Sequence, residues 1–91
     1  MTMIADWLRI DGERVAQSLQ EAQAKLDSVE GELVLDFSTV RRVDPSALRA
    51  QEQFAGVADE KSVKVALRGV NVDVYKVLKL AKLTSRFSFL T

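Results

Sequence analysis

Two hydrophobic periods alternate along this sequence, and their order restricts the possible folds more than any other feature. Short apolar runs such as Leu33–Leu35 are typical of strands, whereas apolar residues spaced three and four apart, as in residues 13–27, are typical of amphipathic helices. The resulting order is strand, helix, strand, helix, strand, helix, strand. That order predicts an α/β domain with right-handed crossovers, in which a small mixed or mostly parallel sheet of about four strands packs with three helices.

The second and third strands are expected at the centre of the sheet. The strand Glu32–Phe37 contains three consecutive apolar residues, a pattern typical of a parallel strand that helices cover on both faces. We expect buried side chains on this strand and on the next one, Val63–Leu67; they are Leu33, Leu35, Val65 and Leu67. The outer strands are predicted around Ile4–Ile10 and in the terminal sequence RFSFL, where Phe87 and Phe89 alternate with other residues.

Three amphipathic helices are predicted between the strands. The first spans Glu13–Asp27, and its apolar face consists of Val15, Leu19, Ala22 and Leu26. The second runs from Pro45 to about Asp59, with Asp44 as its N-cap. Proline suits the first helical position because the N–H that it lacks would have no partner there. The third helix is predicted to begin after Asn71, which is its N-cap.

The composition excludes several classes of function. The 91 residues include 13 basic and 13 acidic side chains, and the resulting net charge of zero argues against nucleic acid as a partner. Because His and Cys are absent, the chain lacks the commonest general base, a thiol nucleophile and most zinc ligands. Most familiar hydrolytic mechanisms are thereby excluded, and we assign no catalytic residue, cofactor or metal site. The sequence has no signal peptide and no apolar stretch of about 18 residues, so we expect one cytoplasmic domain, residues 1–91, without membrane insertion.

The residues with most chemical potential are concentrated where the second helix begins. In the sequence RRVDPSALR, Ser46 occupies the second helical position, and three arginines lie close to it. Free N–H groups and the positive end of the helix dipole favour a phosphate at such a place, so Ser46 is the candidate phosphoacceptor. The alternative interpretation is local, since serine is well tolerated at a helix start. The same segment is the predicted protein-binding surface, which comprises Arg41, Arg42, Asp44, Pro45, Ser46 and Arg49.

These segments resemble the STAS domain family over nearly the whole chain. The family pattern is a buried strand ending in Asp-[Leu/Phe]-Ser, a turn of the type Asp-Ser-Ser-Gly or Asp-Thr-Gly-Gly, a helix, a strand, a Gly-Val pair and another helix. The corresponding stretches here are VLDFSTVRRVDPSALRA and VKVALRGVNVDVYKVLKLAKL. The resemblance implies a non-enzymatic regulatory module, best known in bacteria as an anti-sigma factor antagonist. Such a module binds an anti-sigma factor that is also a protein kinase, and phosphorylation at that turn switches it off.

Departures from the family pattern concern the expected regulation. The family's phosphoacceptor is usually the hydroxyl residue directly after the Asp, and Pro45 occupies that position here. Ser46 stands at the next position, where some members also carry serine. Ala47 replaces the glycine that allows a partner's backbone to approach closely. The family's first two strands are expected to be reduced to one, around Ile4–Ile10.

Other functions remain as alternatives. Within the family, LRGVNVDVYKVLKLAKL resembles the STAS subunits that bind the ATPase of bacterial phospholipid-trafficking ABC transporters. LVLDFS also resembles the phosphoacceptor strand of a receiver domain, in which Asp36 would be phosphorylated with Mg²⁺ held by Asp11 and Glu13. A small-ligand or nucleotide site at the carboxyl edge of the sheet is a further alternative, although neither glycine-rich phosphate motif occurs. An exposed strand edge would also allow a homodimer.

Overall fold

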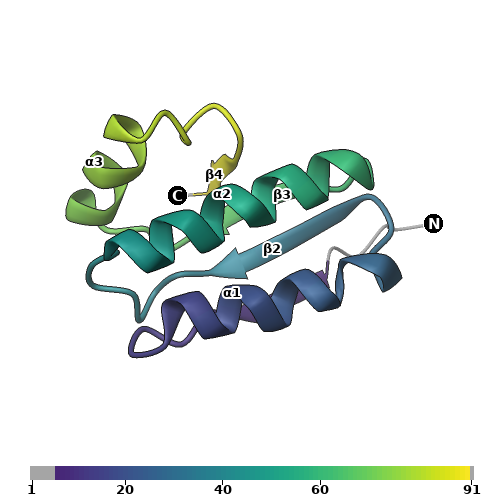
Figure 1. Cartoon of the computed structure of the whole chain (residues 1–91), viewed down its shortest axis with the longest axis horizontal. Coiled ribbons are helices and arrows are strands. Elements are labelled where there is room, and N and C mark those ends of the chain that lie inside the picture. Colours follow the sequence, from purple (N-terminus) through teal and green to yellow (C-terminus); the bar gives the residue numbers. More distant parts are fainter. Residues whose placement is uncertain (1–5, 91) are drawn as a thin grey trace.

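Four parallel strands form one sheet in which each strand lies beside its neighbours in sequence. In the computed structural model, which describes residues 6–90, the strand order is β1-β2-β3-β4, and all three neighbouring pairs are parallel (Figure 1). The strands are Asp6–Arg9 (β1), Glu32–Asp36 (β2), Lys64–Arg68 (β3) and Ser88–Leu90 (β4). The predicted α/β fold with a mostly parallel sheet of about four strands is confirmed.

The three predicted helices are present, with shifted ends. They are α1 (Val15–Ala24), which is followed by the 3-10 turn η1 (Leu26–Ser28), α2 (Pro45–Glu60) and α3 (Val72–Leu80). α1 begins later than predicted because the Asp11 carboxylate accepts a hydrogen bond from the N–H of Glu13 at 2.9 Å, which keeps Glu13 in a turn. Within residues 6–90, no helix has both the length and the apolar character needed to cross a membrane.

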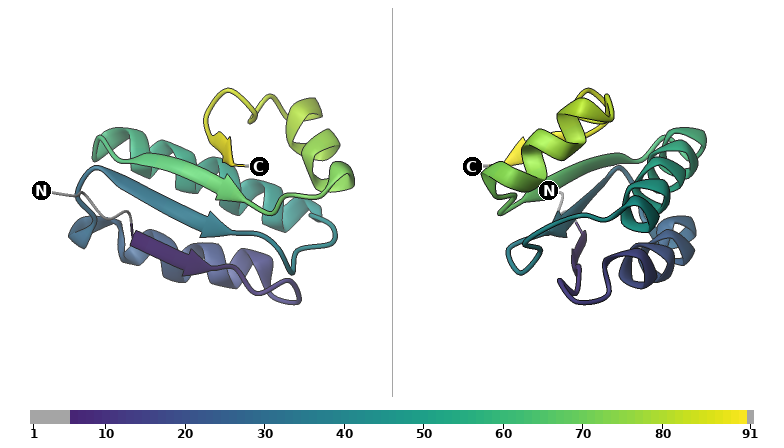
Figure 2. Two further views of the ribbon diagram at one scale, coloured as in Figure 1. Left: turned by 180° about the vertical axis from the view of Figure 1, so that it is seen from behind. Right: turned by 60° about the vertical axis from the view of Figure 1, so that its left-hand side comes forward.

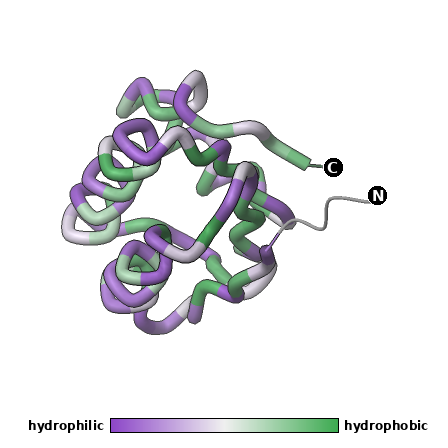
Figure 3. The backbone as a smooth tube through the Cα atoms, turned by 90° about the vertical axis from the view of Figure 1, so that its right-hand side faces the viewer, coloured by the Kyte–Doolittle hydropathy of each residue, from purple (hydrophilic) through white to green (hydrophobic). Residues whose placement is uncertain are grey.

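The hydrophobic core lies between the sheet and the helices. α1 and α2 lie side by side along one face of the sheet, and both are behind the strands when the molecule is turned round (Figure 2). The predicted strand residues are buried in this core, since Leu33, Leu35 and Leu67 are 0% exposed and Val65 is 6% exposed. The buried residues of α3 belong to the same core. Hydrophobic and hydrophilic segments alternate along the helices, as amphipathic helices require (Figure 3).

None of the described helices lies on the other face of the sheet, which corrects the prediction that helices cover β2 on both faces. Seen from behind, β1, β2 and β3 lie in front of α1 and α2, and no described helix crosses them (Figure 2). Right-handed crossovers between strands in sequential order all wind to the same side, and a local apolar run does not encode strand order.

Val34 is nevertheless buried on this open face. The guanidinium carbon of Arg68 lies 5.2 Å from the centre of the Trp7 ring, a cation–π contact. Trp7 belongs to β1 and Arg68 to β3, so their contact spans β2, and the register places Val34 directly beside Trp7. The two side chains thereby cover Val34, which is only 3% exposed.

The outer strands are shorter than predicted. Ile4, where the first strand is predicted to begin, lies outside the described residues. β1 ends at Arg9, although the N–H of Ile10 still donates to the carbonyl oxygen of Asp36 at 2.9 Å. In the terminal segment, β4 begins only at Ser88, and Phe87 is buried just before it. Both edge strands of the sheet are therefore short.

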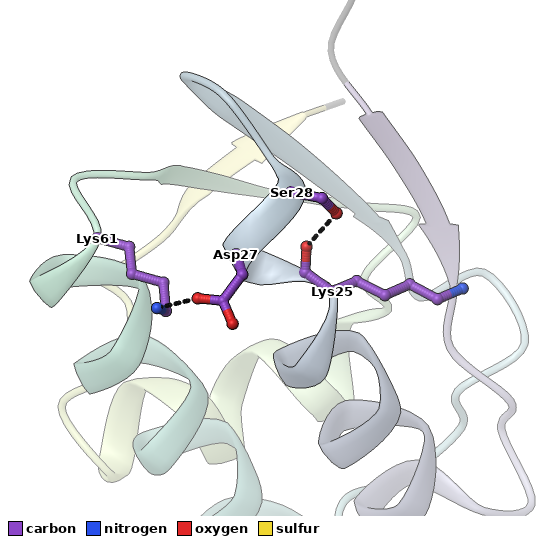
Figure 4. A network of polar contacts seen from close by, with 4 residues as sticks. All are labelled: Lys25, Asp27, Ser28 and Lys61. Carbon is purple, nitrogen blue, oxygen red and sulfur yellow. Dashed lines mark hydrogen bonds and ion pairs between the residues drawn. The ribbon is translucent and has the colours of Figure 1, made fainter.

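Polar contacts also join α2 to the end of α1. Lys61, directly after α2, forms an ion pair with Asp27 of η1, and the Ser28 hydroxyl donates a hydrogen bond to the carbonyl oxygen of Lys25 at 2.9 Å (Figure 4). The paired side chains are exposed, so the ion pair contributes little to stability. These contacts lie one helix length, about 24 Å, from the start of α2. They therefore do not involve the N-terminal end of α2, where the predicted binding residues lie.

Candidate functional site

Three loops gather at the carboxyl end of the sheet. They are residues 10–14 after β1, residues 37–44 after β2 and residues 69–71 after β3. Because the strands are parallel, these loops lie at one edge, on the right-hand side of the left view in Figure 2. α2 begins directly after the second loop, so the predicted binding residues lie at the edge where open α/β sheets usually bind ligands.

Thr39 holds the first and second loops together. Its hydroxyl donates a hydrogen bond to the carbonyl oxygen of Ile10 at 3.1 Å and accepts one from the N–H of Gly12 at 3.2 Å. Any larger residue at Gly12 would force the backbone to shift, since a Cβ there would lie 1.9 Å from the carbonyl oxygen of Thr39. The sequence analysis missed this contact, although a glycine just after a predicted strand is a known sign of close backbone approach.

Asn71 fastens the third loop to the second. Its Nδ2 donates hydrogen bonds to the carbonyl oxygens of Val40 and Arg41, both at 3.2 Å. Its Oδ1 accepts a hydrogen bond from the N–H of Val74 at 2.8 Å, so Asn71 also caps α3, as predicted. The loop before α2 is therefore held from both sides.

Asp36 shapes the turn that follows β2. Its Oδ1 accepts a hydrogen bond from the N–H of Ser38 at 2.8 Å. The pKa of Asp36 is lowered mainly by hydrogen bonds from the side chain and backbone of Ser38. The positive charges of Arg68 and Arg9 lower it further. Ser38 lies close to Gly69, which has a φ of 73° and where a Cβ would lie 3.0 Å from the Ser38 Cα. Within the described residues, no three acidic side chains gather around Asp36 or elsewhere as metal ligands.

α2 begins at Pro45 with Asp44 as its N-cap, as predicted. Asp44 Oδ1 accepts a hydrogen bond from the N–H of Ala47 at 2.8 Å and another from the Ser46 hydroxyl at 3.0 Å. The bond from Ala47 and then that from Ser46 lower the pKa of Asp44, so the carboxylate is ionised at neutral pH. Ser46 is exposed, whereas Ala47 is only 2% exposed and packs in the core. The methyl group that replaces the family's glycine therefore does not stand on the exposed surface.

Two adjoining hollows lie at the start of α2, and only some of the predicted binding residues line them. Arg42 lines the first hollow together with Ser46, and it lines the second together with Arg41. Arg49 is exposed nearly one turn beyond Ser46 on α2. Neither Arg49 nor Pro45 lines these hollows, so the structure brings four of the six predicted residues together around them and leaves two on the adjacent helix surface.

Arg14 is a further residue of this surface that the sequence analysis missed. It precedes α1 and lines the same hollow as Arg42 and Ser46. No local pattern marks it, because it reaches the site from a different loop. The hollow thus combines two arginines with two acidic residues, Glu13 and Asp44, and the arginines of such a mixed surface can bind acidic groups through charge-assisted hydrogen bonds.

Comparisons with known proteins give a consistent assignment. The family model described as the STAS domain matches residues 7–91. No curated protein sequence matches the chain. Four chains of solved structures match it, and one of them is the crystal structure of a Thermotoga maritima protein described as a "putative anti-sigma factor antagonist". That structure has a TM-score of 0.71 and 20% sequence identity, and the match covers 96% of this chain and 74% of the Thermotoga chain. At this identity the likeness shows the fold alone.

Proposed function

This chain belongs to the STAS domain family, and we propose that residues 1–91 act as a single, non-enzymatic regulatory module that binds another protein. The partner that we propose is an anti-sigma factor that is also a protein kinase. It binds at the α2 corner, a name that we give to Arg41, Arg42, Asp44, Pro45, Ser46 and Arg49. The chain would then be an anti-sigma factor antagonist.

The observation that carries this proposal is the way in which the α2 corner is held. Thr39 and Asn71 fasten the preceding loop on two sides, while the charged side chains of the corner stay exposed. A surface held in one conformation loses little conformational entropy when a partner binds. Its mixture of arginines and a carboxylate supplies the electrostatic complementarity that makes binding specific.

Ser46 is the proposed point of control. Its exposed hydroxyl donates to Asp44, and a phosphate would replace that bond with about two negative charges beside the Asp44 carboxylate. Glu13 also lines this hollow and adds to the repulsion, while Arg14, Arg42 and the helix dipole oppose it. A partner that offers an acidic group to the same arginines would be repelled. We therefore expect the phosphate to leave the fold intact and to weaken binding.

Affinity capture from the native organism tests the location of the binding surface. We expect the unaltered chain to retain an anti-sigma kinase, and the double variant Arg42→Glu/Arg49→Glu to lose it. Arg14→Glu should also weaken capture, although the sequence pattern does not single it out. Thermal unfolding should show that these exposed substitutions change stability by no more than about 0.5 kcal/mol.

A matched control keeps the same change of net charge. Lys25→Glu/Lys64→Glu alters two exposed lysines at the opposite end of the molecule and should retain the partner. Equal capture by the arginine double variant and the unaltered chain would place the interface elsewhere. Recovery of an ABC-transporter ATPase in place of an anti-sigma kinase would select the alternative STAS function.

A further inference from the structure

The charges of this chain are divided unevenly along the sequence. Residues 61–90 contain seven basic side chains and one acidic side chain, whereas residues 6–60 contain six basic and twelve acidic ones. Two of the seven, Lys61 and Arg86, form salt bridges with acidic residues of the first part. An asymmetry of this kind, in a chain whose net charge is zero, indicates a local surface that binds negatively charged material.

Three of the other basic residues gather at the C-terminal end of α3. Lys76 and Lys79 lie on the helix, Lys82 follows its end, and all three are exposed. Leu80 lies beside them, one turn after Lys76, and is 86% exposed. Asp73, the only acidic residue of α3, lies in the first turn of the helix. Within residues 6–90, none of the three lysines forms a salt bridge. We call Lys76, Lys79, Leu80 and Lys82 the α3 basic surface.

The position of α3 makes this surface accessible to something flat. α3 lies at one end of the molecule, apart from the pair formed by α1 and α2 (Figures 1 and 2). Its buried residues, Val74 and Leu78, belong to the core. Because a helix turns by 100° per residue, Lys76 and Leu80 lie on the side away from them. The α3 basic surface is therefore convex and faces outward, so a large flat partner can approach it.

We propose that the α3 basic surface binds the anionic headgroups of a phospholipid membrane, on which the domain rests without crossing it. Each lysine near an anionic membrane strengthens binding about fivefold. Leu80 is placed to enter the boundary between the headgroups and the acyl chains.

The residue types favour lipid over other acidic partners. All three charges of the surface are lysines, and lysine is depleted at protein–protein interfaces, where arginine is enriched. The phosphates of a nucleic acid would leave Leu80 in water, whereas a membrane offers it an apolar phase. A membrane is therefore the partner that uses both the lysines and the leucine.

Co-sedimentation with lipid vesicles tests this proposal with the chain alone. Vesicles of phosphatidylglycerol and phosphatidylcholine in equal parts should bind the chain at an ionic strength of about 0.01 M, where charges act over about 30 Å. Vesicles of phosphatidylcholine alone should bind it at least about tenfold more weakly. Binding to the anionic vesicles should also fall steeply at an ionic strength of about 1 M, where the screening length is about 3 Å.

Variants test whether the α3 basic surface is responsible. Lys76→Gln/Lys79→Gln should weaken binding to the anionic vesicles about 30-fold, and Leu80→Ser at least about fivefold. Lys25→Gln/Lys64→Gln is the matched control, because it removes two exposed lysines at the opposite end of the molecule and should bind like the unaltered chain.

Four results would overturn the proposal. They are no binding to the anionic vesicles, equal binding to the neutral ones, equal weakening by the two double lysine variants, and an unchanged affinity of Leu80→Ser. None of these measurements depends on the partner at the α2 corner, so the proposed function and this proposal can fail separately.

Discussion

Replacement of Gln51 by leucine should stabilise this protein. Gln51 lies on α2 one turn after Ala47, and its side chain is 0% exposed. Neither the oxygen nor the nitrogen of its amide has a hydrogen-bond partner within the described residues. A buried polar group without a partner is a defect of the core, because it has lost its hydrogen bonds to water without replacing them.

The size of the effect follows from that lost hydration. Leaving a buried polar group without a partner costs about 1–3 kcal/mol. Leucine is similar to glutamine in size and is as good a helix former, so Gln51→Leu should remove this cost without opening a cavity. We expect the free energy of unfolding to rise by about 1–3 kcal/mol. For a domain of this size, each kcal/mol raises the melting temperature by about 4–8 °C.

Urea and thermal unfolding followed by circular dichroism measure this change. Gln53→Leu is the control, because Gln53 is exposed on the same helix and its replacement should change stability by less than about 0.5 kcal/mol. A Gln51→Leu variant that is less stable than the unaltered protein would refute the reasoning. It would mean that the amide has a partner in solution, such as a buried water.

Three further predictions concern the core, the loops and the helix cap. Leu35→Asp places a charge where the side chain is 0% exposed and should prevent folding, which the loss of dispersed NMR amide signals would show; a folded variant would refute the burial of β2. Gly12→Ala forces a methyl group against a backbone oxygen, so chemical denaturation should show the domain destabilised by about 1–3 kcal/mol. Gly56→Ala is the control inside α2: its methyl group meets nothing within 4 Å, and it should stabilise the domain by about 0.5–1 kcal/mol. Asp44 has a lowered pKa in the folded state, so its charge contributes stability above the unfolded pKa of about 3.9, and this contribution is lost as the pH falls through the folded pKa. A ¹³C NMR titration should place its midpoint below that of an ordinary aspartate and show a rise in Ser46→Ala; an unchanged midpoint in that variant would exclude the hydroxyl as a cause.

Local sequence patterns were sufficient for the elements of this fold. Asp44 and Asn71 make the capping hydrogen bonds that their positions predict, and the period of the apolar residues places α1 and α2 within a few residues of their ends. The prediction that helices cover both faces of β2 was wrong, because the faces that helices cover depend on the strand order. Val34 is shielded by Trp7 and Arg68, two residues far apart in sequence that only the assembled sheet brings together.

The candidate site shows the same division between local and long-range information. Ser46 and Asp44 were predicted as neighbours because a helix start is a local structure. Arg14 and Thr39 were missed because they reach the site through the packing of separate loops. Gly12 gave a usable signal, since a glycine after a strand often marks a close approach, but its contact with Thr39 required the structure.

The affinity of the captured partner for Ser46 variants tests the central claim most directly. Isothermal titration calorimetry should show that Ser46→Ala binds almost as tightly as the unaltered chain, because the small hydroxyl faces Asp44 and not the partner. Ser46→Asp should bind at least about tenfold more weakly, because it adds a negative charge beside the arginines that hold the partner. Mass spectrometry of the chain from native cells should find phosphate on Ser46. Equal affinities of Ser46→Asp and the unaltered chain, with no phosphate on Ser46, would contradict control of binding at the α2 corner.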